Sequence, residues 1–324
     1  MFLILFALSL SFFYPSAVSG GVVSNSGQSD SIVKVWVFFK DKPIQKSGAV
    51  VSERGLARRR SVGFGSGDFR DQPVFGTYIQ LVEATGAKLH LIYKWENCAS
   101  FYTDPLMFQK ISKLPFVEKI RPVAVYRKNT FSSTPFLSRQ IGYNSIYGQS
   151  ATQLTMTSVV EAQDYLLRFR KFRAPGEGVL VALFDGGARI DHKCFSYIRK
   201  NHSVKATWDF VQNDSLTSDD DSIASNPESV HYQDDEHGSQ TLGLIAGYDP
   251  GAFIGAAWGV DLVLAKTENG IWDGESHSEE DNWAAAVVWA ESIGVDIISS
   301  SLGYRVDFRD SVVIKKNGRD TIIR

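Results

Sequence analysis

The chain has 324 residues, of which 44% are hydrophobic and 22% charged, and its 34 Lys+Arg and 36 Asp+Glu give a formal net charge of −2. This composition is ordinary for a folded globular protein and excludes a disordered chain and a collagen-like chain. Two cysteines are too few for a disulfide scaffold. The length predicts about two domains.

The charge is divided unevenly between two halves of the chain. Residues 31–128 carry 17 Lys+Arg and 8 Asp+Glu, whereas residues 129–324 carry 17 Lys+Arg and 27 Asp+Glu. Either the basic half binds an external polyanion such as nucleic acid, or the two halves bind each other. The sequence has neither zinc-ligand spacing nor an aromatic RNA-binding motif, so we expect the halves to bind each other and no nucleic-acid partner.

The N-terminus has the pattern of an export signal. Residues 2–13 are almost entirely apolar, Tyr14-Pro15 ends the run, and the small residues Ala17-Val18-Ser19 follow. This pattern is typical of a secretory signal peptide, with the cut expected after Ser19. An uncleaved membrane anchor is the alternative, but the run is short for a span of ~20 residues. We therefore expect a secreted, extracellular protein, or a periplasmic one, without membrane attachment once the signal is removed.

The basic half is predicted to fold as a small α+β domain. Asp104 is the expected N-cap of one of its helices, with Pro105 at the first helical position. The alternation of strands and helices predicts a small sheet with helices on one face. The expected elements are a strand at 32–39, a basic helix at 50–61, a helix at 74–85, strands at 88–95 and 97–103, a helix at 105–113 and a strand at 116–123.

Arg58-Arg59-Arg60 on the basic helix have two interpretations. They could form a processing site for a protease that cuts after basic residues, or they could belong to the solvated face of the helix. The solvated face is favoured, because a cut at this position would break the predicted domain.

The acidic half places two polar groups beside apolar elements. Residues 179–184 form a continuous apolar run, typical of a buried parallel strand, and Asp185 follows it. Catalytic groups of open α/β sheets lie at the carboxyl ends of strands, so Asp185 is a candidate, although turns also place Asp at strand ends. His237 is predicted to open a helix that runs to Gly247. A surface histidine beside an acidic run is the alternative interpretation of His237.

A parallel strand–helix–strand unit is predicted at the end of the chain. Residues 259–266 form a further apolar strand, residues 279–293 an amphipathic helix, and residues 296–302 another strand. A strand, a crossover helix and a second strand are typical of a parallel sheet.

These segments together resemble the subtilisin-like serine proteases, the subtilases. The family's strand–Asp–Thr/Ser–Gly motif corresponds to residues 183–187, its His-Gly-Thr-His motif to residues 237–240, and its Ser-Leu-Gly segment to residues 301–303. The resemblance implies an α/β fold: a subtilisin-like three-layer domain with a parallel sheet, incomplete here, preceded by a small α+β propeptide-like domain.

The resemblance also implies roles for individual residues. Asp185 and His237 would be two members of an Asp-His-Ser catalytic triad. Ser301, Leu302 and Gly303 would bind the substrate.

The signal pattern and the resemblance together predict four segments. Tyr147-Gly148-Gln149-Ser150 is the expected junction at which the mature enzyme begins. The segments are a signal peptide at 1–19, a propeptide- or inhibitor-like domain at 20–130, a linker and the start of the mature region at 131–175, and the N-terminal part of the catalytic domain at 176–324.

Some family features are missing from the sequence. Gly186 replaces a hydroxyl residue that helps to orient the catalytic Asp, and Gln240 replaces the family's second His. The subtilisin serine follows the histidine by well over ~100 residues, whereas only residues 238–324 follow His237, and they contain no Gly-Thr-Ser-Met-Ala or Ala-Gly-Asn segment. We therefore expect a secreted subtilisin-like serine endopeptidase, present here as a fragment that lacks its nucleophile and is inactive alone.

The expected partners are a polypeptide substrate and the protein's own propeptide domain, and the expected catalysis needs no cofactor. Gln153 and the run Asp219-Asp220-Asp221 are weak candidates for a structural calcium site. Two other functions stay open: a non-catalytic protein that binds or inhibits proteases through its propeptide-like domain, and a metal-binding α/β domain. The ligands of that metal would be His231, Asp234, Asp235 and His237.

Overall fold

The computed structural model describes most of the chain between Ile32 and Ile323. The expected signal peptide, Asp219-Asp220-Asp221, His231 and Gly303 lie outside the described residues. No helix among the described residues is long and apolar enough to cross a membrane. The described ranges are 32–43, 51–65, 69–123, 146–218, 234–268, 279–302, 312–316 and 319–323, the last two by their backbone.

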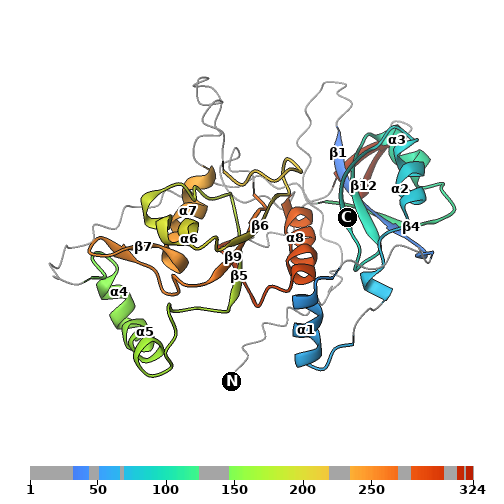
Figure 1. Cartoon of the computed structure of the whole chain (residues 1–324). Coiled ribbons are helices and arrows are strands. Elements are labelled where there is room, and N and C mark those ends of the chain that lie inside the picture. Colours follow the sequence, from blue (N-terminus) through green and yellow to red (C-terminus); the bar gives the residue numbers. More distant parts are fainter. Residues whose placement is uncertain are drawn as a thin grey trace.

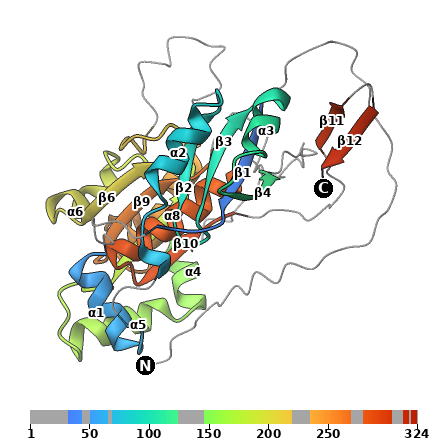
Figure 2. The ribbon, with the colours of Figure 1, turned by 90° about the vertical axis from the view of Figure 1, so that its right-hand side faces the viewer.

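The N-terminal domain is a four-stranded antiparallel sheet with the strand order β2-β3-β1-β4. Two helices cover one face of this sheet, as the sequence predicted (Figure 2). Asp104 caps the second of them by accepting a hydrogen bond of 2.7 Å from the Met107 N–H. The elements are β1 (Val33–Phe39), α1 (Glu53–Ser61), α2 (Gly76–Glu83), β2 (Lys88–Tyr93), β3 (Cys98–Thr103), α3 (Pro105–Ile111) and β4 (Val117–Pro122), with a 3₁₀ turn η1 (Phe69–Asp71).

Strand β1 divides its side chains between two neighbours. Val35, Val37 and Phe39 are buried in one apolar core with α2 and α3. Since side chains alternate along a strand, Lys34 lies on the opposite face, where it reaches the C-terminal domain.

The C-terminal domain is built on a four-stranded parallel sheet with the order β10-β5-β9-β6. All six residues of β5 are buried, as expected for a central parallel strand. The α/β fold class predicted from the sequence is therefore confirmed. The elements that form and cover this sheet are β5 (Leu180–Asp185), α6 (Ser196–Lys200), β6 (Val204–Asp209), α7 (Asp234–Ala246), β9 (Asp261–Lys266), α8 (Glu280–Ile293) and β10 (Ile297–Ser300).

Several short elements surround the parallel sheet. The predicted junction segment contacts this domain, because the Gln149 N–H donates to the Ala252 carbonyl at 2.9 Å. Two helices in residues 146–175 were not predicted. The short elements are α4 (Ala151–Met156), α5 (Val159–Arg168), the 3₁₀ turn η2 (Lys193–Phe195), the hairpin of β7 (Tyr248–Asp249) and β8 (Phe253–Ile254), and the hairpin of β11 (Val312–Lys316) and β12 (Arg319–Ile323).

Helix α7 begins earlier than the sequence predicted. It starts at Asp234, so His237 lies in its first turn rather than at its first position. The prediction followed the apolar pattern, which starts only after His237. The preceding acidic residues extend the helix, because carboxylates are favourable near the positive amino end of a helix.

Helix α8 is the layer that the two sheets share. In Figure 1 it lies between the N-terminal sheet and the parallel sheet, with α2 and α3 beyond the first and α7 beyond the second. Leu91 of β2 belongs to the same apolar core as Ala286 and Ala290 of α8 and Phe184 of β5. The expectation of an amphipathic helix was wrong in this respect, because a helix that is apolar around most of its circumference is covered on more than one side.

Polar contacts join the two domains at the amino end of α8. Lys34 Nζ lies 2.8 Å from Asp281 Oδ1, and His90 Nε2 lies 3.0 Å from Asn282 Oδ1. The basic half supplies the cation and the acidic half supplies the anion. The expectation that the two halves bind each other is therefore confirmed.

His90 is buried at this interface. Burial and the Lys34 charge, with a smaller effect from Lys88, lower the pKa of His90, whereas Asp281 and Asn282 act in the opposite direction. The contact between the domains therefore favours neutral His90, and protonation of the ring opposes it.

We expect acid to weaken the contact between the domains through His90. Its pKa is lower in the docked state, so its contribution is complete above the ordinary histidine pKa of about 6.5 and is lost as the pH falls below that value. The free energy of unfolding, measured by urea denaturation from about pH 8 to about pH 5.5, should fall by up to about 1.4 kcal/mol per pH unit where His90 titrates.

The variant His90→Gln should flatten this part of the pH profile. The matched control is His202→Asn, because His202 is exposed and has a left-handed φ of 50°, which Asn tolerates. An unchanged slope in His90→Gln, or an equal loss of slope in the control, would contradict the prediction.

Candidate active site

Strand β5 carries Asp185 to the carboxyl edge of the parallel sheet. The Asp185 side chain is 1% exposed, and its backbone carbonyl accepts a hydrogen bond of 2.9 Å from the Thr267 N–H. Catalytic groups of open α/β sheets lie at this edge. The position of Asp185 is therefore fixed by the most buried strand of the domain.

Helix α7 brings His237 to the same place. His237 Nδ1 lies 2.8 Å from Asp185 Oδ1. Because an ionised carboxylate only accepts hydrogen bonds, this geometry assigns the proton to Nδ1 and leaves Nε2 as the acceptor of the ring. The His237 side chain is 57% exposed. An oriented and accessible imidazole of this kind can act as a general base.

Glycines allow the two elements to come so close. A Cβ atom at Gly238 would lie 1.7 Å from the Gly187 carbonyl oxygen, so no side chain fits there. Gly187 has a φ of +116° and packs against the Thr217 carbonyl oxygen, which a Cβ atom would approach to 2.4 Å. Gly187 and Gly238 therefore have a steric reason to be glycine.

Two further donors hold the Asp185 carboxylate. The Gly186 N–H donates to Oδ1 at 2.8 Å, and the Thr241 hydroxyl lies 2.9 Å from Oδ2. The sequence predicts that a hydroxyl is missing at position 186, and the structure places one on α7 instead. Sequence reasoning missed Thr241, although its spacing of four residues from His237 places both on one face of a helix.

A second contact ties the segment after β5 to α7. Arg189 Nε lies 2.8 Å from Asp235 Oδ2, and the Arg189 N–H donates to Ser239 Oγ at 2.8 Å. The Ser239 hydroxyl in turn donates to the Asp235 carbonyl at 2.6 Å. These bonds fix the first turn of α7, and with it His237, relative to the loop that follows Asp185.

The predicted substrate-binding residues follow β10. This strand pairs in parallel with β5, and Ser300 lies opposite Phe184. Ser301 and Leu302 therefore leave the sheet at the edge where Asp185 lies, while Gly303 is outside the described residues.

The alternative metal site gains no support from the described side chains. Asp235 is bound to Arg189, and His237 is bound to Asp185. Within the described ranges, no group of three or more His, Cys, Asp or Glu residues could hold a metal ion.

Comparisons with protein families assign both domains. Residues 34–135 match the peptidase S8 propeptide domain of Bacteroidota, and residues 176–320 match the subtilase family. Within this chain a propeptide domain is therefore followed by a domain that belongs to the subtilase family.

Solved structures of subtilisin-like proteases are similar at low identity. Fervidolysin from Fervidobacterium pennivorans, a keratinolytic enzyme related to subtilisin, is 13% identical with a TM-score of 0.46, over 85% of this chain and 36% of its own. Two structures of the epidermin leader peptide processing serine protease from Staphylococcus aureus are 11% identical, with TM-scores of 0.47 and 0.45 over 83% and 88% of this chain. The chain spans only 36–52% of the length of these proteins. No curated protein gives a significant sequence match.

We expect Thr241→Val to disturb the imidazole of His237. The variant keeps the size of the side chain but removes a donor from a buried carboxylate, which should reduce the free energy of unfolding by about 1–3 kcal/mol. The carboxylate is then free to turn, so the share of His237 with its proton on Nδ1 should fall, as measured by ¹⁵N NMR of the imidazole in residues 1–324.

Thr241→Ser is the matched control, because it keeps the hydroxyl and should keep the Nδ1–H tautomer. If Thr241→Val and Thr241→Ser gave the same ¹⁵N shifts for His237, Thr241 would have no part in holding the pair.

Proposed function

We propose that this chain is part of the precursor of a secreted serine endopeptidase, in which Asp185 and His237 are two members of an Asp-His-Ser triad. The observation that carries the proposal is the hydrogen bond of 2.8 Å between His237 Nδ1 and Asp185 Oδ1. The fully buried carboxylate is held by two further donors, Gly186 N–H and Thr241 Oγ1. A carboxylate held in this way orients one histidine tautomer, which is the function of the Asp in such a triad.

In the proposed mechanism, His237 moves a proton between the serine and the substrate. Nε2 takes the proton of the serine hydroxyl while the serine oxygen attacks the peptide carbonyl. Asp185 stays ionised and stabilises the imidazolium. The same proton passes from Nε2 to the leaving amine as the peptide bond breaks. Water then attacks the acyl-enzyme, and His237 takes a proton from this water and returns it to the serine oxygen as the acyl group leaves.

The substrate in this proposal is an extended polypeptide that lies along Ser301, Leu302 and Gly303. The exit of Ser301 and Leu302 at the edge that carries Asp185 supports this placement. The reaction is acyl transfer to water and uses protein groups alone, so no cofactor is needed. The signal pattern of residues 1–19 supports secretion, with the propeptide domain as the intramolecular partner.

The nucleophile in this proposal is a serine in a Gly-Thr-Ser segment, which residues 1–324 do not contain. We therefore expect a polypeptide of residues 1–324 not to hydrolyse casein or fluorogenic peptides above the buffer rate. Loss of a triad member costs several orders of magnitude in rate, and a side-chain oxyanion donor is also missing from the sequence. Purified residues 1–324 and His237→Ala would be assayed side by side. Turnover that disappears in His237→Ala would show that another nucleophile serves the site.

The triad is tested in a polypeptide that carries the serine. The gene would be sequenced beyond codon 324, and any product with an in-frame Gly-Thr-Ser segment would be expressed and assayed. Asp185→Asn should lower kcat by about 10⁴-fold, because it favours the wrong imidazole tautomer, and His237→Ala should lower it at least as far. An active protein that tolerates either substitution would refute the assignment of these residues.

A further inference from the structure

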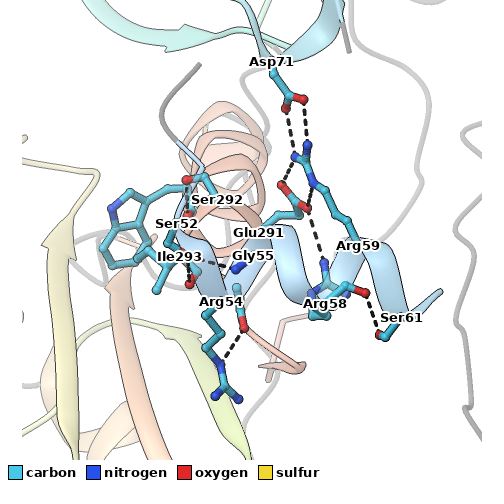
Figure 3. A network of polar contacts seen from close by, with 12 residues as sticks. Ser52, Arg54, Gly55, Arg58, Arg59, Ser61, Asp71, Glu291, Ser292 and Ile293 are labelled. Carbon is cyan, nitrogen blue, oxygen red and sulfur yellow. Dashed lines mark hydrogen bonds and ion pairs between the residues drawn. The ribbon is translucent and has the colours of Figure 1, made fainter. Parts of the chain in front are cut away.

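Helix α1 of the propeptide domain lies end to end with α8 of the peptidase domain, its amino end against the carboxyl end of α8 (Figures 1 and 3). Gly55, its buried residue, packs against α8 rather than against the core of its own domain: a Cβ atom there would lie 3.2 Å from the Ser292 carbonyl oxygen. This contact is remote from the pairing of Lys34 and His90 with the amino end of α8.

The amino end of α1 caps the carboxyl end of α8. The last carbonyls of a helix have no partner within the helix. The Ser52 N–H donates to the Ser292 carbonyl at 2.8 Å, and the Ser52 hydroxyl donates to the Ile293 carbonyl at 2.6 Å. The same hydroxyl accepts from the Gly55 N–H at 3.0 Å and so caps α1 as well. The positive end of one helix dipole meets the negative end of the other, which is a favourable arrangement.

Arg54 extends this contact to the parallel sheet. Its Nε donates to the Gly294 carbonyl at 3.0 Å, and its guanidinium pairs with Asp296. Asp296 also accepts a hydrogen bond of 2.9 Å from the Leu180 N–H at the start of β5. A residue of the propeptide domain thus reaches the amino ends of β5 and β10.

Arg59 supplies the charged part of the contact (Figure 3). Its guanidinium binds Asp71 of η1 at 2.7 and 2.9 Å and Glu291 of α8 at 2.7 and 2.6 Å. The side chains of Arg59, Asp71 and Glu291 are only 11%, 2% and 15% exposed. The carboxylates of Glu291 and Asp71 raise the pKa of Arg59 further above its usual range. The interpretation of Arg58-Arg59-Arg60 as a solvated face is therefore wrong for Arg59, because its partners lie outside the helix and are invisible to a local pattern.

Gly294 makes this close approach feasible. It ends α8 in a left-handed conformation with a φ of +94°, and a Cβ atom there would lie 2.5 Å from the Gly55 backbone nitrogen. The chain turns at Gly294 from α8 into β10. This turn is therefore in direct contact with α1.

We propose that α1 is a clasp through which the propeptide domain holds the carboxyl end of α8 and the first residues of β10 in place. The clasp is a second attachment, distinct from the contact between the N-terminal sheet and α8. Its partner is the segment 289–298, and the recognition chemistry is helix capping together with one buried guanidinium between two carboxylates. Since β10 leads into Ser301 and Leu302, the propeptide domain orders this strand from the end opposite to the candidate active site.

Hydrogen–deuterium exchange of residues 1–324 tests the clasp. Arg59→Gln removes the guanidinium that joins the buried carboxylate of Asp71 to that of Glu291, which is strongly unfavourable. Exchange in residues 289–298 and 51–61 should become at least tenfold faster, while α2, inside the propeptide core, stays protected as in the wild type. Arg60→Gln is the matched control, because it removes the same charge from an exposed position of the same helix and should leave both segments protected.

Two more variants separate the clasp from general effects of charge or folding. Arg59→Lys keeps the charge but not the paired geometry, so its exchange should lie between wild type and Arg59→Gln. Glu291→Gln should resemble Arg59→Gln, and the double variant should add little to either. Equal exchange of 289–298 in Arg59→Gln and Arg60→Gln would reject the clasp. So would an equally large loss of protection in α2, since Arg59 would then serve the whole fold.

Discussion

A helix shared by two sheets is the constraint on which this structure depends. Helix α8 is rich in alanine and buries residues toward both domains, and Phe184 of β5 packs edge-on against Trp283 of α8. Apolar surface of this kind loses stabilisation when it is returned to water. The parallel sheet that carries Asp185 is therefore built against a helix whose other side needs the propeptide domain.

The charges of the two domains act at the ends of this shared helix. Exposed ion pairs contribute little to stability, so the opposite charges of the two halves mainly steer and orient their association. The buried pairs have a different effect. Lys34 and Asp281, or Arg59 and Glu291, have little contact with water, so a docked domain that missed one partner would leave an uncompensated buried charge. Burial of apolar surface thus stabilises the interface, and these buried ion pairs fix the orientation in which the two domains dock.

Local patterns in the sequence were sufficient for the elements of the N-terminal domain, for β5, α7, β9, α8 and β10, and for the candidate pair, but not for α4 and α5. The Asp104 cap, the buried run before Asp185 and the helix that carries His237 all follow from signals within a few residues. Thr241 and Arg59 were not predicted, because their partners lie 56 and 232 residues away. A hydroxyl on a helix or a run of arginines has many local explanations, and only the packing of β5, α7 and α8 selects among them.

The strands β5 and β10 connect the contact with α1 to the candidate active site. Their amino ends are joined by Asp296, which Arg54 of the propeptide domain contacts. Their carboxyl ends present Asp185 on one strand and lead into Ser301 on the other. Because both strands are short and paired along their length, a shift at the amino ends moves the carboxyl ends as well, since close-packed interiors transmit displacement. Through Arg54, the propeptide domain can therefore influence the geometry of the candidate active site from the far edge of the sheet.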